Sequence, residues 1–78
     1  MAEAYPGYLK PPRRFRSISD KEMAVLRLMA RGLNNTQIAQ ELGVNLGTVK
    51  FHVKNIMQKL NAGNRTVAVK VAQEEGLL

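Results

Sequence analysis

The sequence predicts an all-α fold: four short helices that follow a disordered amino-terminal arm. Apolar residues recur at helical spacing in four successive segments after residue 18. Each segment is preceded by a Ser or Asn residue and followed by a stretch that contains glycine, which are the usual start and stop signals of helices. A four-helix domain is therefore expected over residues 18–78.

The length and composition of the chain limit what it can be. With 78 residues it has room for one small domain, and without cysteine it has neither a disulfide framework nor a thiolate metal site. No apolar stretch approaches the roughly 20 residues needed to span a bilayer, and the first residues lack the apolar core of a signal peptide. We therefore expect a soluble, cytoplasmic protein with no membrane partner.

The charge of the chain is unevenly distributed. The net charge is +6, and four of the twelve basic residues lie within residues 1–17, together with all three prolines. A small basic domain favours a polyanionic partner, of which nucleic acid is the commonest. We expect residues 1–17 to be a flexible basic arm or linker. The alternative is an arm that itself contacts nucleic acid.

The first helix is predicted over residues 20–31. Ser19 followed by Glu22 is the pattern of a capping box, and Gly32 is suited to end the helix because positive φ costs glycine little. The residues expected to face the core are Val25, Leu26, Met29 and Ala30.

A short second helix is expected to begin after Asn34 or Asn35 and to end at Gly43. Its expected inward-facing residues are Ile38, Ala39 and Leu42. The turn over residues 43–45 joins it to the next helix, and two helices joined by so short a turn with a glycine are typical of a helix-turn-helix motif. An ordinary helical hairpin would give the same pattern.

The third helix, over residues 45–60, has two distinct faces at about 100° per residue. One face is apolar and consists of Val49, Val53, Ile56 and Leu60. The opposite face consists of Gly47, Lys50, Phe51, Lys54 and Gln58. Solvent-exposed helix faces usually mix acidic and basic residues, yet this segment has no acidic residue. We interpret it as a recognition helix that lies in the major groove of DNA.

The fourth helix is predicted from about residue 65 to residue 75, with Asn64 as its cap. Its apolar residues are too many for one face, so we expect Val67 and Val71 to form an exposed pair on which two copies of the chain associate. Lys70 and Glu74 belong to the same expected dimer interface. The alternative is that the chain termini fold over the two valines.

Motifs throughout residues 18–78 resemble, without gaps, the carboxy-terminal DNA-binding domain of the LuxR family, which includes the NarL, FixJ and GerE types. The resemblance is carried by Ile18-Ser19-x-Lys21-Glu22-x-x-Val25-Leu26, Ala30-x-Gly32-Leu33-Asn34-Asn35-x-x-Ile38-Ala39, Leu42-Gly43-Val44, Thr48-Val49-Lys50-x-His52-x-x-Asn55-Ile56-x-x-Lys59-Leu60, Asn64-Arg65-Thr66-x-Ala68-Val69-x-x-Ala72 and Gly76-Leu77. It implies a four-helix domain of a transcriptional regulator that binds double-stranded DNA as a homodimer through the fourth helix.

The resemblance also implies roles for individual residues. The residues expected to contact base edges are Lys50, Phe51 and Lys54. Those expected near the phosphate backbone are Asn35, Thr36, Thr48 and Lys59, to which the free amides at the start of the third helix add Gly47. Leu46 and Gly47 depart from the family, which commonly has polar residues there, so this is where we expect the chain's own sequence preference to arise.

Other functions have less support in the sequence. His52 is the single histidine, and without cysteine or clustered carboxylates we expect no metal site and no cofactor. No Ser has a base at a meaningful spacing, so we expect no enzyme activity. The alternatives that remain are a helix-turn-helix module that docks on RNA polymerase or another regulator, and a protein that coats nucleic acid without sequence preference.

Overall fold

The computed structural model describes residues 18–78, and within them it contains four helices and no strand. The helices are α2 (Asp20–Ala30), α3 (Asn35–Leu42), α4 (Leu46–Lys59) and α5 (Arg65–Glu74). The predicted all-α class is thus confirmed, and the predicted helix bounds agree to within one or two residues. The expected arm over residues 1–17 lies outside the described residues.

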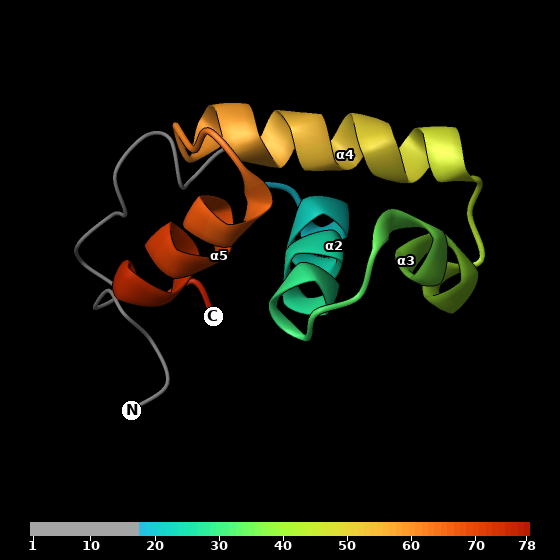
Figure 1. The fold of residues 1–78 in the computed structure, drawn as a ribbon, viewed down its shortest axis with the longest axis horizontal. Coiled ribbons are helices and arrows are strands. Elements are labelled where there is room, and N and C mark those ends of the chain that lie inside the picture. The colour runs from blue at the N-terminus through green and yellow to red at the C-terminus, as the bar shows by residue number, and fades with distance from the viewer. Residues whose placement is uncertain (1–17) are drawn as a thin grey trace.

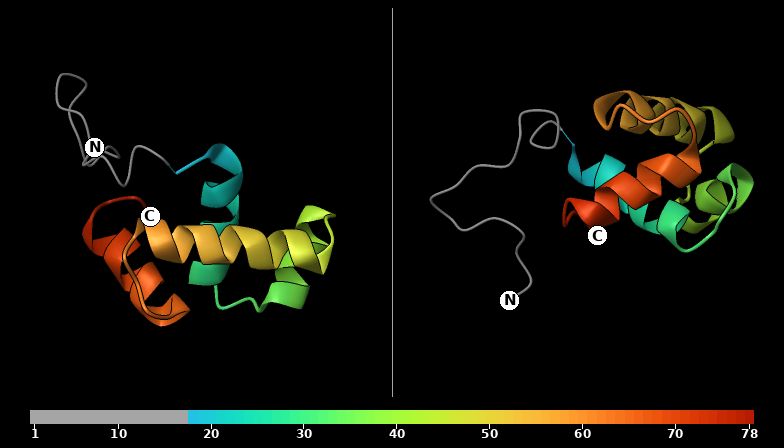
Figure 2. Two further views of the ribbon diagram at one scale, coloured as in Figure 1. Left: turned by 90° about the horizontal axis from the view of Figure 1, so that it is seen from above. Right: turned by 60° about the vertical axis from the view of Figure 1, so that its left-hand side comes forward.

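The longest helix, α4, runs along one edge of the domain and crosses the other three (Figure 1). The amino-terminal part of α4 lies next to α3, and its carboxy-terminal part lies next to α5, with α2 between them (Figures 1 and 2). Because α4 rests on all three other helices along one side, its opposite side faces outward over its whole length.

Side-chain caps fix where the helices begin. Ser19 and Glu22 form the predicted capping box of α2, with N–H···O distances of 2.9 and 3.1 Å. Asn34 caps α3 in the same reciprocal way with Gln37, at 2.8 Å in both directions, which decides between the two asparagines considered from the sequence. Asn45 and Asn64 cap α4 and α5. The start of each helix is therefore encoded locally.

The core lies between the inner side of α4 and the other helices. The buried hydrophobic residues are Val25, Leu26, Leu28, Met29, Ile38, Ala39, Val49, Val53, Ile56, Leu60, Ala68 and Ala72. Two expectations about it were wrong. Leu28 is buried because α2 contacts three neighbouring helices and buries a wider arc than a single stripe, whereas Ala30, the last residue of α2, is exposed. Leu42 lies at the end of α3 and remains 37% exposed.

The turn between α3 and α4 has the geometry of a helix-turn-helix motif. Gly43 ends α3 in the left-handed region with φ 68°, where a side chain would be strained. The N–H of Val44 then donates to the carbonyl of Ala39 at 3.1 Å, and Asn45 begins the next helix. This tight connection sets α4 across α3 and fixes the direction in which the outer side of α4 faces.

None of the helices within residues 18–78 has the length and apolarity needed to cross a membrane.

Candidate nucleic-acid interface

The outer face of α4 is exposed as predicted. Its members are Gly47, Lys50, Phe51, Lys54 and Gln58. Phe51 is 62% exposed, the highest value among the large hydrophobic residues of the described chain. The inner face of the same helix is buried. The two-faced reading of α4 is therefore confirmed, and the three candidate base-contacting residues share one accessible surface.

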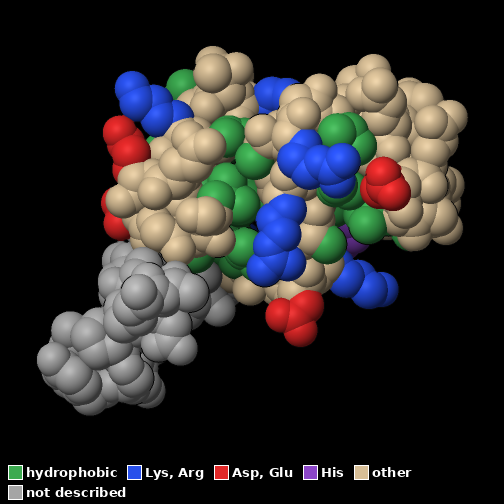
Figure 3. All heavy atoms as spheres, turned by 90° about the horizontal axis from the view of Figure 1, so that it is seen from below, with side chains coloured by type: hydrophobic (Ala, Val, Ile, Leu, Met, Phe, Trp, Pro, Cys, Tyr) green, Lys and Arg blue, Asp and Glu red, His purple; other side chains and the backbone are tan. Residues whose placement is uncertain are grey.

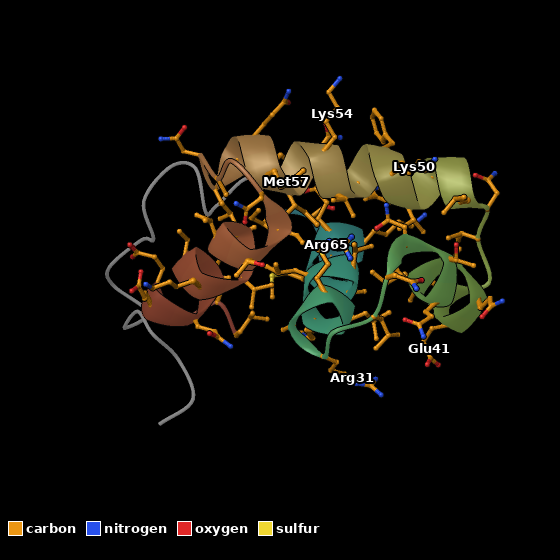
Figure 4. All side chains as sticks on the ribbon, in the orientation of Figure 1. Arg31, Glu41, Lys50, Lys54, Met57 and Arg65 are labelled. Carbon is orange, nitrogen blue, oxygen red and sulfur yellow. The ribbon has the colours of Figure 1, made fainter. Side chains whose placement is uncertain are left out.

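Charge is arranged differently on the two sides of the domain. The sequence of α4 contains basic residues and no acidic residue, and Lys54 extends away from the other helices (Figure 4). Seen from the opposite side, the domain shows acidic and basic side chains interspersed (Figure 3). Since mixed charges on the far side partly cancel, the outer face of α4 is the surface best suited to attract a polyanion.

Beside α4 lies an open groove of about 740 Å³, which we call the α3–α5 groove. Its lining combines the amino-terminal ends of α3 and α5 with one side of α4. The lining residues are Asn34, Asn35, Thr36, Leu46, Lys50, Val53, Met57, Gly63, Asn64 and Arg65. The lining includes two cations and no carboxylate, and Lys50, Met57 and Arg65 are seen around it in Figure 4. The amino-terminal ends of two helices add further partial positive charge there.

Arg65 holds the two helix ends of this groove together. One guanidinium nitrogen, Nη1, donates to the carbonyl of Leu33 at 3.0 Å, and Nη2 donates to Oδ1 of Asn35. Arg65 thus ties the start of α5 to the start of α3. From the sequence, this residue was expected only to begin the fourth helix, because its partners lie 30 and 32 residues away along the chain.

The residues expected near phosphates fall into two groups. Asn35 and Thr36 line the α3–α5 groove, and Gly47 and Thr48 lie in the first turn of α4. The N–H and hydroxyl of Thr48 both donate to Oδ1 of Asn45, at 2.8 and 3.0 Å. The amide of Thr48 is therefore bonded, and the expectation that the amides at the start of α4 are free was wrong for this residue. Gly47 belongs to the outer face of α4, and the other three residues flank the amino-terminal half of that face.

Lys59 lies apart from those residues and has an intramolecular partner. Its ammonium donates to Oε1 of Glu22 at 2.6 Å, and its side chain is only 30% exposed. Glu22 is 4% exposed. Burial acts to raise the pKa of Glu22, but the hydrogen bonds and charge supplied by Lys59, together with the bonds from Ser19, leave that pKa below its ordinary value. In the free domain Lys59 therefore stabilises the fold by pairing with Glu22.

The expected association face on α5 is only partly exposed. Val67 is 39% exposed, and Lys70 and Glu74 are exposed as well. Val71 is instead half-buried and packs against the core, so the expectation that both valines are exposed was wrong for one of them. The exposed part of this face is consequently narrower and more polar than the sequence indicated.

His52 lies in a second hollow, of about 230 Å³, on the other flank of α4. The hollow is lined by Lys21, Ala24, Val25, Leu42, Val44, Thr48 and His52. The Nδ1 atom of His52 is buried without a hydrogen-bond partner. Over residues 18–78 no group of three or more His, Asp or Glu residues is placed to hold a metal ion.

Comparison with known proteins agrees with this geometry. Residues 16–72 match the family model described as bacterial regulatory proteins of the luxR family. The nitrate/nitrite response regulator protein homolog of Haemophilus influenzae is 44% identical over 59 residues, which cover 76% of this chain and 28% of that protein. The transcriptional regulatory protein YdfI of Bacillus subtilis is 40% identical over 70 residues, covering 90% of this chain and 33% of that protein.

A solved structure shares the fold as well. The response regulator ChrA of a heme-sensing two-component system superposes with a TM-score of 0.78 at 35% identity, over 88% of this chain and 33% of that chain. The chain thus spans about a third or less of the length of each of these relatives. With the family model matching most of its length, and with the helix-turn-helix motif in place, the chain belongs to the luxR family of bacterial regulatory proteins.

Proposed function

We propose that the domain binds double-stranded DNA in a sequence-specific manner and thereby regulates transcription, with α4 in the major groove. The observation that carries this proposal is the outer face of α4, which is exposed, cationic and free of acidic residues. Lys50 and Lys54 make no ion pair with any described residue, so their ammonium groups are available to guanine O6 and N7.

The flanks of α4 supply the positioning contacts in this proposal. Asn35 and Thr36 at the α3–α5 groove, with Thr48 at the start of α4, would face phosphates on the two sides of the major groove. Arg65 would act indirectly, since its bonds to Leu33 and Asn35 hold the start of α3 in place.

The test is selection of bound sequences from a random pool of duplexes, followed by measurement of affinity for the selected site. Lys50→Ala and Lys54→Ala should each weaken binding and relax preference at one position, by about 1–3 kcal/mol. Arg27→Ala, which removes an exposed cation from α2, is the matched control for charge. Unchanged affinity in both lysine variants would refute the assignment of α4 as the recognition helix.

We further propose that two copies associate through α5, with Val67 at the contact and Lys70 and Glu74 at its edge. A symmetric pair of domains would place two copies of α4 on a two-fold symmetric site. No catalytic role is proposed, and the relatives named above are regulators by description.

The hollow at His52 supports a second candidate function, contact with a protein such as RNA polymerase. Leu42 and Val44 are 37% and 39% exposed there, beside Lys21. Val44→Asp should then abolish regulation of transcription in a reconstituted assay while leaving the affinity for DNA unchanged. If regulation and DNA affinity were lost together, the residues of the hollow would be needed for folding and not for contact with a partner.

A further inference from the structure

Gly47 occupies a helical position where nothing in the described part of the chain requires a glycine. It is the second residue of α4, and its φ is not among the positive values found at Gly32, Gly43 and Gly76. A Cβ built at Gly47 would meet only Oδ1 of Asn45, at 3.4 Å, which is ordinary van der Waals contact. Glycine is also a poor helix former. The fold would thus accept alanine here and gain helix propensity from it.

The bare position lies next to the exposed ring of Phe51. Residues four apart share one helix face, and side chains in a helix lean toward its amino terminus, so Phe51 leans toward the space above Gly47. The Phe51 ring is 62% exposed, and its one ring contact within residues 18–78 is with His52, at 5.9 Å between centroids and 59° between planes. The ring is therefore held only at one edge, next to a stretch of backbone without a side chain.

We propose that Gly47 and Phe51 together read a thymine. This inference rests on the proposed DNA binding. The 5-methyl group of thymine is the apolar group that a base pair presents in the major groove, and Phe51 is the one aromatic ring on the outer face of α4. Because Gly47 has no side chain, the edge of the base pair can approach the backbone of α4 closely enough for its methyl group to meet the ring.

The residues beside Phe51 are suited to a different base. Lys50 and Lys54, which flank Phe51 along the helix, offer donors that suit the acceptor atoms of guanine. The ring of Phe51 offers no hydrogen-bond donor, so it suits the methyl group of thymine instead. A side chain at Gly47 would stand on the same face one turn before the ring and would hold the base pair away from it.

Replacing thymine with uracil tests the inference, because it removes the methyl group and leaves the base pairing and the sugar unchanged. The full chain is first used to select a site from random duplexes, and each thymine of that site is then replaced in turn. We expect the replacement of one thymine in each half-site to lower the affinity of the wild-type chain for the duplex about fourfold. This is the effect on affinity of losing one buried methyl-sized group. Phe51→Ala should bind the thymine and uracil duplexes equally at that position.

Gly47→Ala provides the second arm of the test. It should unfold at the same or a higher temperature than the wild type, bind the selected site about tenfold more weakly, and lose the preference for thymine over uracil. The inference would be overturned if either variant kept the wild-type preference for thymine over uracil. It would also be overturned if the wild-type chain selected a site but showed no such preference. A wild-type chain that selects no site at all would instead refute the proposed DNA binding.

Discussion

The ammonium of Lys59 lies 2.6 Å from the carboxylate of Glu22, and this ion pair joins the last turn of α4 to the first turn of α2. The same carboxylate oxygen accepts the N–H of Ser19 at 2.9 Å. Glu22 is therefore both a helix cap and one half of a contact between two helices, with a partner 37 positions away in the sequence. The two roles explain why a carboxylate is tolerated at 4% exposure.

Removing Lys59 should destabilise the domain because it leaves the buried carboxylate of Glu22 without its charged partner. We expect Lys59→Ala to lower the free energy of unfolding by about 1–3 kcal/mol in urea titrations. Lys54→Ala, on the exposed side of the same helix, is the control and should change it by no more than about 0.5 kcal/mol. Equal effects of the two substitutions would contradict a structural role for Lys59.

The stability of the domain should fall in acid because of Glu22. Its pKa in the folded chain lies below its ordinary value of 4.5, so its contribution is fully present above about pH 4.5 and is lost as the pH falls through the lowered value. Thermal unfolding measured between pH 3 and pH 6 should show this loss. In Glu22→Gln the unfolding temperature should fall less between pH 6 and pH 3 than in the wild type. An unchanged pH profile in that variant would exclude Glu22 as the source of the acid sensitivity.

Arg65 should affect DNA affinity without contacting a base. Arg65→Lys removes the two-pronged link to Leu33 and Asn35, because an ammonium does not reproduce the fork of the guanidinium. We expect a loss of about 1–2 kcal/mol in stability and weaker binding to every duplex, with the selected sequence unchanged. A changed sequence preference would show instead that Arg65 reads bases directly. Arg27→Lys, at an exposed position of α2, serves as the control for exchanging one cation for the other.

Val67 should control association of the chain. Val67→Lys places a charge on the exposed part of α5, which disfavours an apolar contact between two copies. We expect a weaker dimer in sedimentation equilibrium and a loss of cooperative binding to the full site, while affinity for a single half-site stays the same. Gln73→Lys adds the same charge at another exposed position of α5 and should leave association intact. A dimer unaffected by Val67→Lys would place the contact elsewhere.

Local features of the fold were predictable from the sequence. The cap side chains of Ser19, Asn45 and Asn64 accept hydrogen bonds from residues only three positions ahead. Each cap can therefore be recognised from a few neighbouring residues in the sequence. The two faces of α4 follow from a single period along one helix. These features needed no knowledge of how the helices pack.

Features that depend on several helices were harder to predict. The burial of Leu28 follows from the position of α2 among three neighbours, which a single helical stripe does not encode. The partners of Lys59 and Arg65 are 30 or more residues away along the chain, so the sequence indicated neither contact. Val71 was expected to be exposed because the apolar residues of α5 are too many for one face. It is half-buried instead, because the tertiary packing sets how wide a face of α5 is covered.

The separation of α4 into an inner and an outer face has a consequence for how such a protein can diversify. The residues that hold α4 in place, such as Val49 and Ile56, are fully buried, whereas Lys50 and Lys54 are exposed and contribute little to folding. Substitutions on the outer face should therefore be nearly neutral for stability. A duplicated copy of the chain could acquire a new target site through a few such changes while keeping the same scaffold.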